Sequence, residues 1–222
     1  MKILRQSFDL FSVLVLIFSC FFIFLGFWQI DRANEKKMII ATLSKEPVAL
    51  TLSSLNDSHQ KGYRKVRFEN GTWLDQGYVK KNVVKDGELG AQVYRLYCQK
   101  HDCIVVNFGW LKMNETLDLN SNNLSQVVFG VLRPLPYVII KEQGPLEQYQ
   151  GYGAIVSIDA NYLAQSVGRN IVPFELLIDQ SLTKYQQLTT LPKVSVARHY
   201  GYALQFYLLA LVLVIGYIYL KK

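Results

Sequence analysis

The chain has 222 residues, with 24 Lys and Arg against 17 Asp and Glu. This length allows one ordinary domain with membrane segments and leaves little room for a second domain. Between residues 31 and 198, 20 basic residues are interspersed with 16 acidic ones, with no run of five like charges. The charge pattern therefore argues against a nucleic-acid-binding protein.

Two stretches without a charged residue, 10–28 and 202–220, are each 19 residues long. As helices with a rise of about 1.5 Å per residue, each would extend roughly 28 Å, close to the thickness of a bilayer's hydrocarbon core. We predict transmembrane helices at 8–30 and 199–220. A cleavable signal peptide is the alternative for the first, although its apolar part is long and no Ala-x-Ala site follows.

The charges at the two chain ends predict the topology. Lys2 and Arg5 precede the first apolar stretch, and Lys221 and Lys222 follow the second. The positive-inside rule places both termini in the cytoplasm and residues 31–198 on the other side of the membrane. Basic residues just after the first stretch work against this assignment. We expect a multi-pass protein with two spans.

The segment between the two stretches has the pattern of a mostly β domain. Residues 32–43 are expected to continue the first helix as a polar stalk, and 46–47 and 53–58 to form a loop. Strands are predicted at 66–69, 73–79, 90–97, 104–111, 126–132, 153–158 and 171–178, the last broken by Pro173. Asp159 and Gly168 are suitable caps for a helix at 162–167. The domain is predicted to be α+β, with a small curved or closed sheet.

Cys98 and Cys103 bracket a predicted four-residue hairpin loop. Such a hairpin places their sulfur atoms opposite each other, and an oxidising compartment would favour a disulfide. Free thiols are a second interpretation, and a metal site completed by His101 is a third. Only three ligands are present for that site, and their spacing is not a common zinc pattern. Cys20 lies in the first apolar stretch and is expected to be an inert side chain.

The common catalytic motifs are absent from the sequence. It contains no Gly-x-Ser-x-Gly, His-Glu-x-x-His or phosphate-binding Gly-Lys-Ser/Thr pattern. A membrane-tethered hydrolase could use Ser44 with Lys45, or Ser195 with Lys193, but nothing around these pairs is specialised. We expect the protein not to be an enzyme.

Several motifs resemble those of the Surfeit locus protein 1 family. The end of the first apolar stretch, Leu25-Gly26-Phe27-Trp28-Gln29-Ile30-Asp31-Arg32, resembles its Leu-Gly-x-Trp-Gln-x-x-Arg signature. Five further elements follow in the family's order: Tyr63-Arg64-Lys65-Val66 to Gly71-Thr72-Trp73; Asn82 with Gly90 and Val93; Val105-Val106-Asn107-Phe108-Gly109-Trp110-Leu111; Gly130-Val131-Leu132-Arg133; and Arg198-His199-Tyr200-Gly201-Tyr202-Ala203-Leu204. The chain departs at Phe108 and Arg198, where the family has Arg and Asn, and at Phe206, where Trp is frequent.

The resemblance implies a membrane factor for the assembly of haem–copper cytochrome c oxidase. The implied cofactor is haem a, held transiently and delivered to, or stabilised for, the oxidase's catalytic subunit. That subunit is the expected partner, with a haem a synthase as a second one and membrane lipid around both helices. Because no presequence precedes the first helix, we expect a bacterial inner (cell) membrane and a periplasmic central domain. The role is that of a chaperone.

His199 is the candidate axial ligand of the haem iron, because neutral imidazole is the commonest such ligand. In a helix beginning near residue 198, Tyr202 and Phe206 share its face at i+3 and i+7. Trp28 and Arg32 on the first helix are expected at the same level, with Arg32 near a haem propionate. The plainer interpretations are an interfacial His, an aromatic-belt Trp and a snorkelling Arg. No other metal site on the protein is expected.

One alternative function needs no haem. A membrane-tethered scaffold would hold oxidase subunits or a haem synthase, and His199 would then be structural only.

Overall fold

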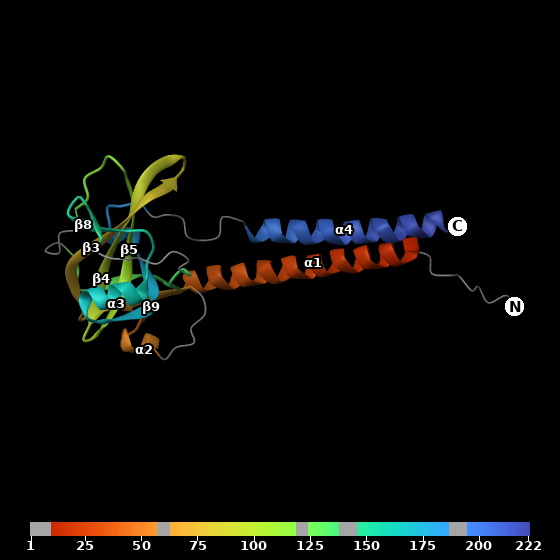
Figure 1. Cartoon of the computed structure of the whole chain (residues 1–222). Helices are drawn as coiled ribbons and strands as arrows, with labels where there is room; N and C mark the ends of the chain where they lie inside the picture. Colours follow the sequence, from red (N-terminus) through yellow and green to blue (C-terminus); the bar gives the residue numbers. More distant parts are fainter. Residues whose placement is uncertain (1–9, 57–62, 119–123, 138–145, 187–194) are drawn as a thin grey trace. The chain divides into compact units, whose positions relative to one another are not determined.

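The computed structural model describes residues 10–56, 63–118, 124–137, 146–186 and 195–222 (Figure 1). The chain divides into two compact units. Residues 1–40 and 191–222 form the helix unit, which contains two long helices, and residues 41–190 form the sheet unit.

The two helices are α1, Leu10–Leu43, and α4, Val196–Leu220. Both are long and apolar enough to cross a membrane, which is consistent with membrane anchoring. The predicted polar stalk at 32–43 is confirmed as part of one continuous 34-residue helix. Residues 8 and 9 of the predicted first span, with Lys2 and Arg5, lie outside the described residues. The second helix begins three residues before the predicted 199, because Ser195 caps it by accepting a hydrogen bond from Arg198 N at 3.3 Å.

The sheet unit contains one mixed sheet, which has nine strands in the described part of the chain. Their order across the sheet is β1-β2-β6-β9-β5-β4-β3-β8-β7. The pairs β1–β2, β3–β8 and β5–β9 are parallel, and the other neighbours are antiparallel. The strands are β1 Val48–Ala49, β2 Arg64–Phe68, β3 Thr72–Lys85, β4 Glu88–Gln99, β5 Asp102–Lys112, β6 Val128–Pro134, β7 Glu147–Tyr149, β8 Tyr152–Ile155 and β9 Asn170–Ile178.

The sheet is open, so of the predicted curved or closed sheet the closed alternative is wrong. Strands β1 and β7 form its two edges. They are only two and three residues long, and such short edges offer few unpaired backbone groups to another strand. A mixed, sheet-rich domain between two terminal apolar helices is confirmed.

Both faces of the sheet are buried under apolar side chains. One face packs with Leu55 of α2, Ser53–Asn56, and the other with Leu163 of α3, Ala160–Val167. Burial of both faces explains why β4 and β5 have nearly continuous apolar runs rather than alternation. The loop predicted at 53–58 is wrong over the residues of α2, and residues 57 and 58 lie outside the described part.

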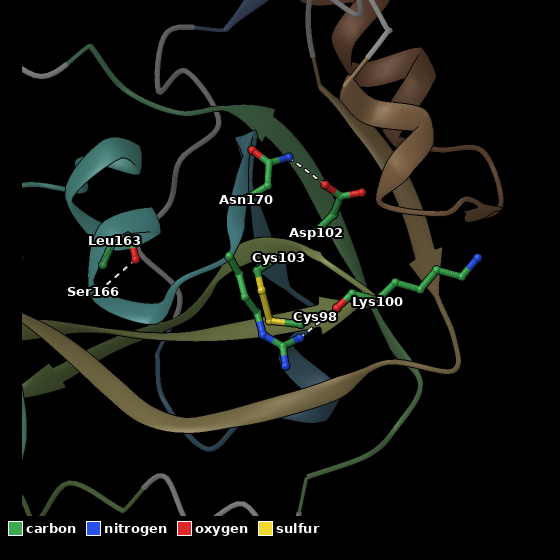
Figure 2. The surroundings of a disulfide bond; sticks show 8 residues. Cys98, Lys100, Asp102, Cys103, Leu163, Ser166 and Asn170 are labelled. Carbon is green, nitrogen blue, oxygen red and sulfur yellow. Dashed lines mark hydrogen bonds between the residues drawn. A yellow bond between two sulfur atoms is a disulfide. The ribbon is translucent and has the colours of Figure 1, made fainter.

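The hairpin of β4 and β5 brings the two cysteines together. Cys98 pairs directly with Cys103, and a disulfide joins their sulfur atoms (Figure 2). The loop is shorter than predicted, because Gln99 pairs with Asp102 and leaves only two residues in the turn. Asp102 also accepts a hydrogen bond from Asn170 Nδ2 at 2.7 Å, which ties the hairpin to β9.

Helix α3 has the predicted caps. Asp159 accepts hydrogen bonds from Asn161 N and Tyr162 N, and Gly168 ends the helix with a φ of 65°. Strand β9 runs unbroken through Pro173, contrary to the prediction. Its register with β5 shifts beside this proline, and such a bulge removes the need for a backbone N–H.

A buried ion pair joins β6 to β9. The guanidinium of Arg133 contacts the Glu175 carboxylate, whose side chain is fully buried, and Glu175 Oε2 has no hydrogen-bond partner among the described residues. Burial raises the pKa of the Glu175 carboxyl, and the Arg133 charge opposes that shift.

Removing the cation alone should destabilise the sheet unit strongly. We expect Arg133→Met to lower the free energy of unfolding by about 3–5 kcal/mol, because it strands a buried carboxylate, whereas Arg133→Met with Glu175→Leu should recover most of the loss. Denaturant unfolding of the purified chain in mild detergent measures both. Equal losses in the single and double variants would contradict the assignment.

Candidate functional site

Small side chains line the face of α1 that packs in the helix unit. Ser12, Ser19, Gly26 and Ala33 are its buried residues and stand seven apart. Ala203 and Ala210 of α4 are buried and also stand seven apart. A seven-residue spacing keeps the positions on one side of a helix, and small residues let two backbones approach closely. The helices meet along this line of small residues, which we call the seam.

Side-chain contacts show that the two helices are antiparallel. Ser12 Oγ lies 2.7 Å from Tyr217 Oη near the start of α1 and the end of α4. Farther along, Phe22 stacks on Phe206 with ring centroids 6.2 Å apart. The Tyr207 ring covers Gly26 so closely that an added Cβ would overlap it.

His199 lies in the seam, in the first turns of α4. Its Nδ1 is 2.6 Å from Oε1 of Gln29 on α1. Its other ring nitrogen, Nε2, is enclosed and has no hydrogen-bond partner among the described residues. Four residues on, Ala203 is almost fully buried and leaves room for the approach of α1. The imidazole is therefore hydrogen-bonded at one nitrogen, while the other is enclosed without a partner among the described residues.

The other predicted site residues divide between the seam and the outside of the helix unit. Phe206 is partly buried in the seam, whereas Tyr202 and Trp28 are 46% and 44% exposed. The Arg32 guanidinium lies 5.7 Å from the Trp28 ring centroid and forms a 2.7 Å ion pair with Glu35. Trp28 is the chain neighbour of Gln29, so these outward-facing residues lie at the same level as His199.

Sequence reasoning missed Gln29 as a functional residue. It belongs to the quoted Trp28-Gln29 motif, but no role was assigned to it. A usable signal existed: Gln29 follows Gly26 by three and precedes Ala33 by four, which places a polar side chain on the small-residue face of an apolar helix. A second missed pair is Tyr200 Oη, which donates to Asn34 Oδ1 at 3.3 Å.

In the sheet unit, motif residues make contacts within the fold. Asn107 Oδ1 accepts a hydrogen bond from Gly109 N at 3.0 Å. Phe108, at a position where the family has Arg, is 2% exposed, and its ring centroid lies 5.4 Å from that of Trp73. An apolar side chain is thus suited to this place.

Described residues of the sheet unit line two hollows. One of about 210 Å³ is lined by Trp73, Ser125 and Leu182 among others, and an open one of about 440 Å³ by Thr51, Arg67 and Gln99 among others. Neither is lined by His199 or by the other candidate haem contacts.

The serines proposed for a hydrolase are both used in helix contacts. Ser44 Oγ donates to Ala41 O at 2.9 Å, and Ser195 Oγ accepts from Arg198 N. Lys193 lies outside the described residues.

Close packing at Gly26 should be required for the seam. We expect Gly26→Leu to separate the helices around Tyr207 at a cost of about 1–3 kcal/mol, while Gly216→Leu, with open space around its glycine, should have little effect. Nitroxide labels at Ile17 and Leu211, both exposed, in a Cys20→Ala background would report the interhelical distance. An unchanged distance distribution in Gly26→Leu would contradict the packing.

The chain was compared with known families and proteins. A family model described as the SURF1 family matches residues 16–211, which is nearly the whole chain and includes parts of both long helices and the whole sheet unit. No curated protein matches. Proteins of this family are known as cytochrome oxidase assembly factors. The extent of the match confirms the resemblance in the motifs, and the chain belongs to the SURF1 family.

Proposed function

We propose that the chain assists the assembly of a haem–copper cytochrome c oxidase by binding haem a at the helix unit and passing it to the catalytic subunit. The observation that carries the proposal is the environment of His199. Nδ1 is hydrogen-bonded to Gln29, and Nε2 is a buried nitrogen without a partner. Buried polar atoms are normally paired, so an unpaired one at this position suggests a bond made with something else.

The residues at this end of the helix unit fit a haem in their chemistry. When bound, haem a supplies an iron whose axial position accepts an imidazole nitrogen. His199 offers that nitrogen, and Phe206, Tyr202 and Trp28 offer aromatic surface for a flat macrocycle. Arg32 would hold a propionate by exchanging its contact with the exposed Glu35 for the new carboxylate. The exposed ion pair with Glu35 contributes little stability, so this exchange costs little.

The arrangement suits temporary binding rather than permanent storage. His199 would be a single protein ligand of the haem iron. Its Nε2 is enclosed, so the iron could reach it only after the atoms that cover Nε2, which we call its cover, move apart. Closing of the cover would favour the ligand-free state and thereby promote release. We propose that the protein performs no catalytic step of its own.

The cover over Nε2 also favours one alternative, the haem-free scaffold. In that case His199 and Gln29 serve only to join α1 and α4. The sheet unit and the outer faces of the helices would hold the oxidase's catalytic subunit or a haem a synthase. The two functions differ in whether the isolated protein retains a pigment.

A difference spectrum tests the haem proposal. The chain is co-expressed with enzymes that make haem a and purified in mild detergent. We expect a haem a signal in the reduced-minus-oxidised spectrum of the wild type, and a loss of at least tenfold in His199→Ala, because the axial ligand is removed. His101→Ala is the control, since His101 lies in the exposed β4–β5 turn.

Two results would overturn haem binding at His199. One is a colourless wild type under conditions where a known haem a protein becomes loaded. The other is an equal signal in His199→Ala and the control. A colourless wild type that co-purifies with oxidase subunits would support the scaffold function.

We further propose that the protein lies in a bacterial inner membrane, with both termini cytoplasmic and residues 31–198 periplasmic. The Cys98–Cys103 disulfide supports this placement, because such bonds form and persist in oxidising compartments. The basic residues at both chain ends support it independently.

The placement predicts the redox state of the cysteines in cells. After acid trapping and denaturation, a maleimide polymer should modify one of the three cysteines without reductant, Cys20, and all three after reduction. In Cys20→Ala, no cysteine should be modified without reductant and two should be modified after reduction. Three modifications of the wild type without reductant would place the hairpin in a reducing compartment.

A further inference from the structure

We propose that Gln29 is a positioning residue that holds His199 in one tautomer, with the proton on Nδ1 and the lone pair on Nε2. The inference rests on the proposed haem site and deepens it. Gln29 of α1 would then determine which ring nitrogen of His199, on α4, is available to a metal.

The contact between the two side chains carries the inference. Gln29 Oε1 lies 2.6 Å from His199 Nδ1, a short hydrogen bond. An amide oxygen can only accept, so Nδ1 must donate. In a neutral imidazole the second nitrogen is then an acceptor. This is the arrangement in which the second hydrogen bond of a metal-binding His fixes the ring for ligation.

The small residues of the seam bring α1 and α4 close together at Gln29. Gly26 and Ala33, three residues before and four after it, are both buried. Ala203, four residues after His199, is buried on the opposing helix. Small side chains on both sides of the contact bring the helices close enough for a single amide to bridge them. The neighbouring bond from Tyr200 to Asn34 ties the same end of the pair.

The state of Nε2 agrees with this tautomer. Nε2 is enclosed without a partner. With the proton on Nδ1, the unpaired group is a lone pair. The opposite tautomer would leave an unpaired N–H donor at the same buried position.

The neutrality of Gln29 also matters for release. Carboxylates in this position raise the basicity of a ligating His and strengthen metal binding. An amide orients the ring by the same hydrogen bond without a negative charge. The site is thus oriented for binding, while the bond to the metal is weaker than a carboxylate would make it.

The first test uses the haem-free chain and needs no activity. The protein has three histidines, so ¹⁵N-histidine labelling gives few ring signals, and His199→Ala identifies those of His199. We expect a protonated Nδ1 and an unprotonated Nε2 in the wild type, and a mixture of tautomers in Gln29→Leu. A protonated Nε2 in the wild type would overturn the proposal, because the amide of Gln29 would then present its NH₂ group.

The second test uses the haem-loaded chain with a conservative rescue and a matched control. We expect Gln29→Leu to weaken haem retention by about 10–100-fold, the usual effect of removing an outer-shell partner. Gln29→Glu keeps an acceptor and should retain haem at least as well as the wild type, with a lower reduction potential. Asn34→Leu removes the neighbouring interhelical bond and should change retention less than threefold.

The outcomes separate this inference from the proposed function. If the wild type fails to load haem, the proposed function fails, and the tautomer in the haem-free chain still decides the role of Gln29. If Gln29→Leu retains haem like the wild type, or Asn34→Leu loses as much as Gln29→Leu, the positioning role is overturned.

Discussion

The close approach of α1 and α4 is the constraint on which the candidate site depends. Helices that pair inside a bilayer have no hydrophobic driving force, so the packing of small residues and hydrogen bonds must hold them together. The seam supplies both. The Tyr207 ring packs against Gly26. Ser12 is hydrogen-bonded to Tyr217 at one end of the seam, and His199 to Gln29 at the other. A larger side chain in the seam would remove the contact that orients the imidazole.

Several motif residues of the sheet unit stabilise the fold. Gly71 is one: its N donates to the Tyr97 hydroxyl at 2.8 Å, and that hydroxyl donates to Gln126 O at 2.6 Å, so β4 is joined to the starts of β3 and β6. Gly130 lies against the backbone of Leu177, where any side chain would collide. Arg133 neutralises the buried Glu175. The residues proposed to contact a haem all belong to the helix unit.

Elements determined by local sequence could be predicted. The caps Asp159 and Gly168 indicate α3, an uninterrupted apolar run indicates each long helix, and two apolar runs around a short polar loop indicate the β4–β5 hairpin. The same hairpin register brings Cys98 and Cys103 together.

Features set by distant parts of the chain could not be predicted. The parallel pairing of β5 with β9, and the edges β1 and β7, depend on contacts between segments far apart in sequence. Local patterns carry no information about such partners. For the same reason His199 could be chosen from its chemistry and the resemblance, and Gln29 from its place on the small-residue face, whereas the contact between them, 170 positions apart, could be recognised only once the helices were seen to pair.

The proposed haem carrier would have to combine orientation with weak binding. Orientation would come from the hydrogen bond between Gln29 and His199, which lasts only while the seam is intact. A neutral amide as the outer partner would make the bond to the metal weaker than a carboxylate would, and the enclosed Nε2 would have to be uncovered before a ligand could bind. A partner that separates α1 from α4 would remove the orienting bond and so lower the affinity for the cargo. Docking and release would then be coupled through the packing of Gly26 and the contact of Gln29 with His199, with no need for a second ligand to compete for the metal.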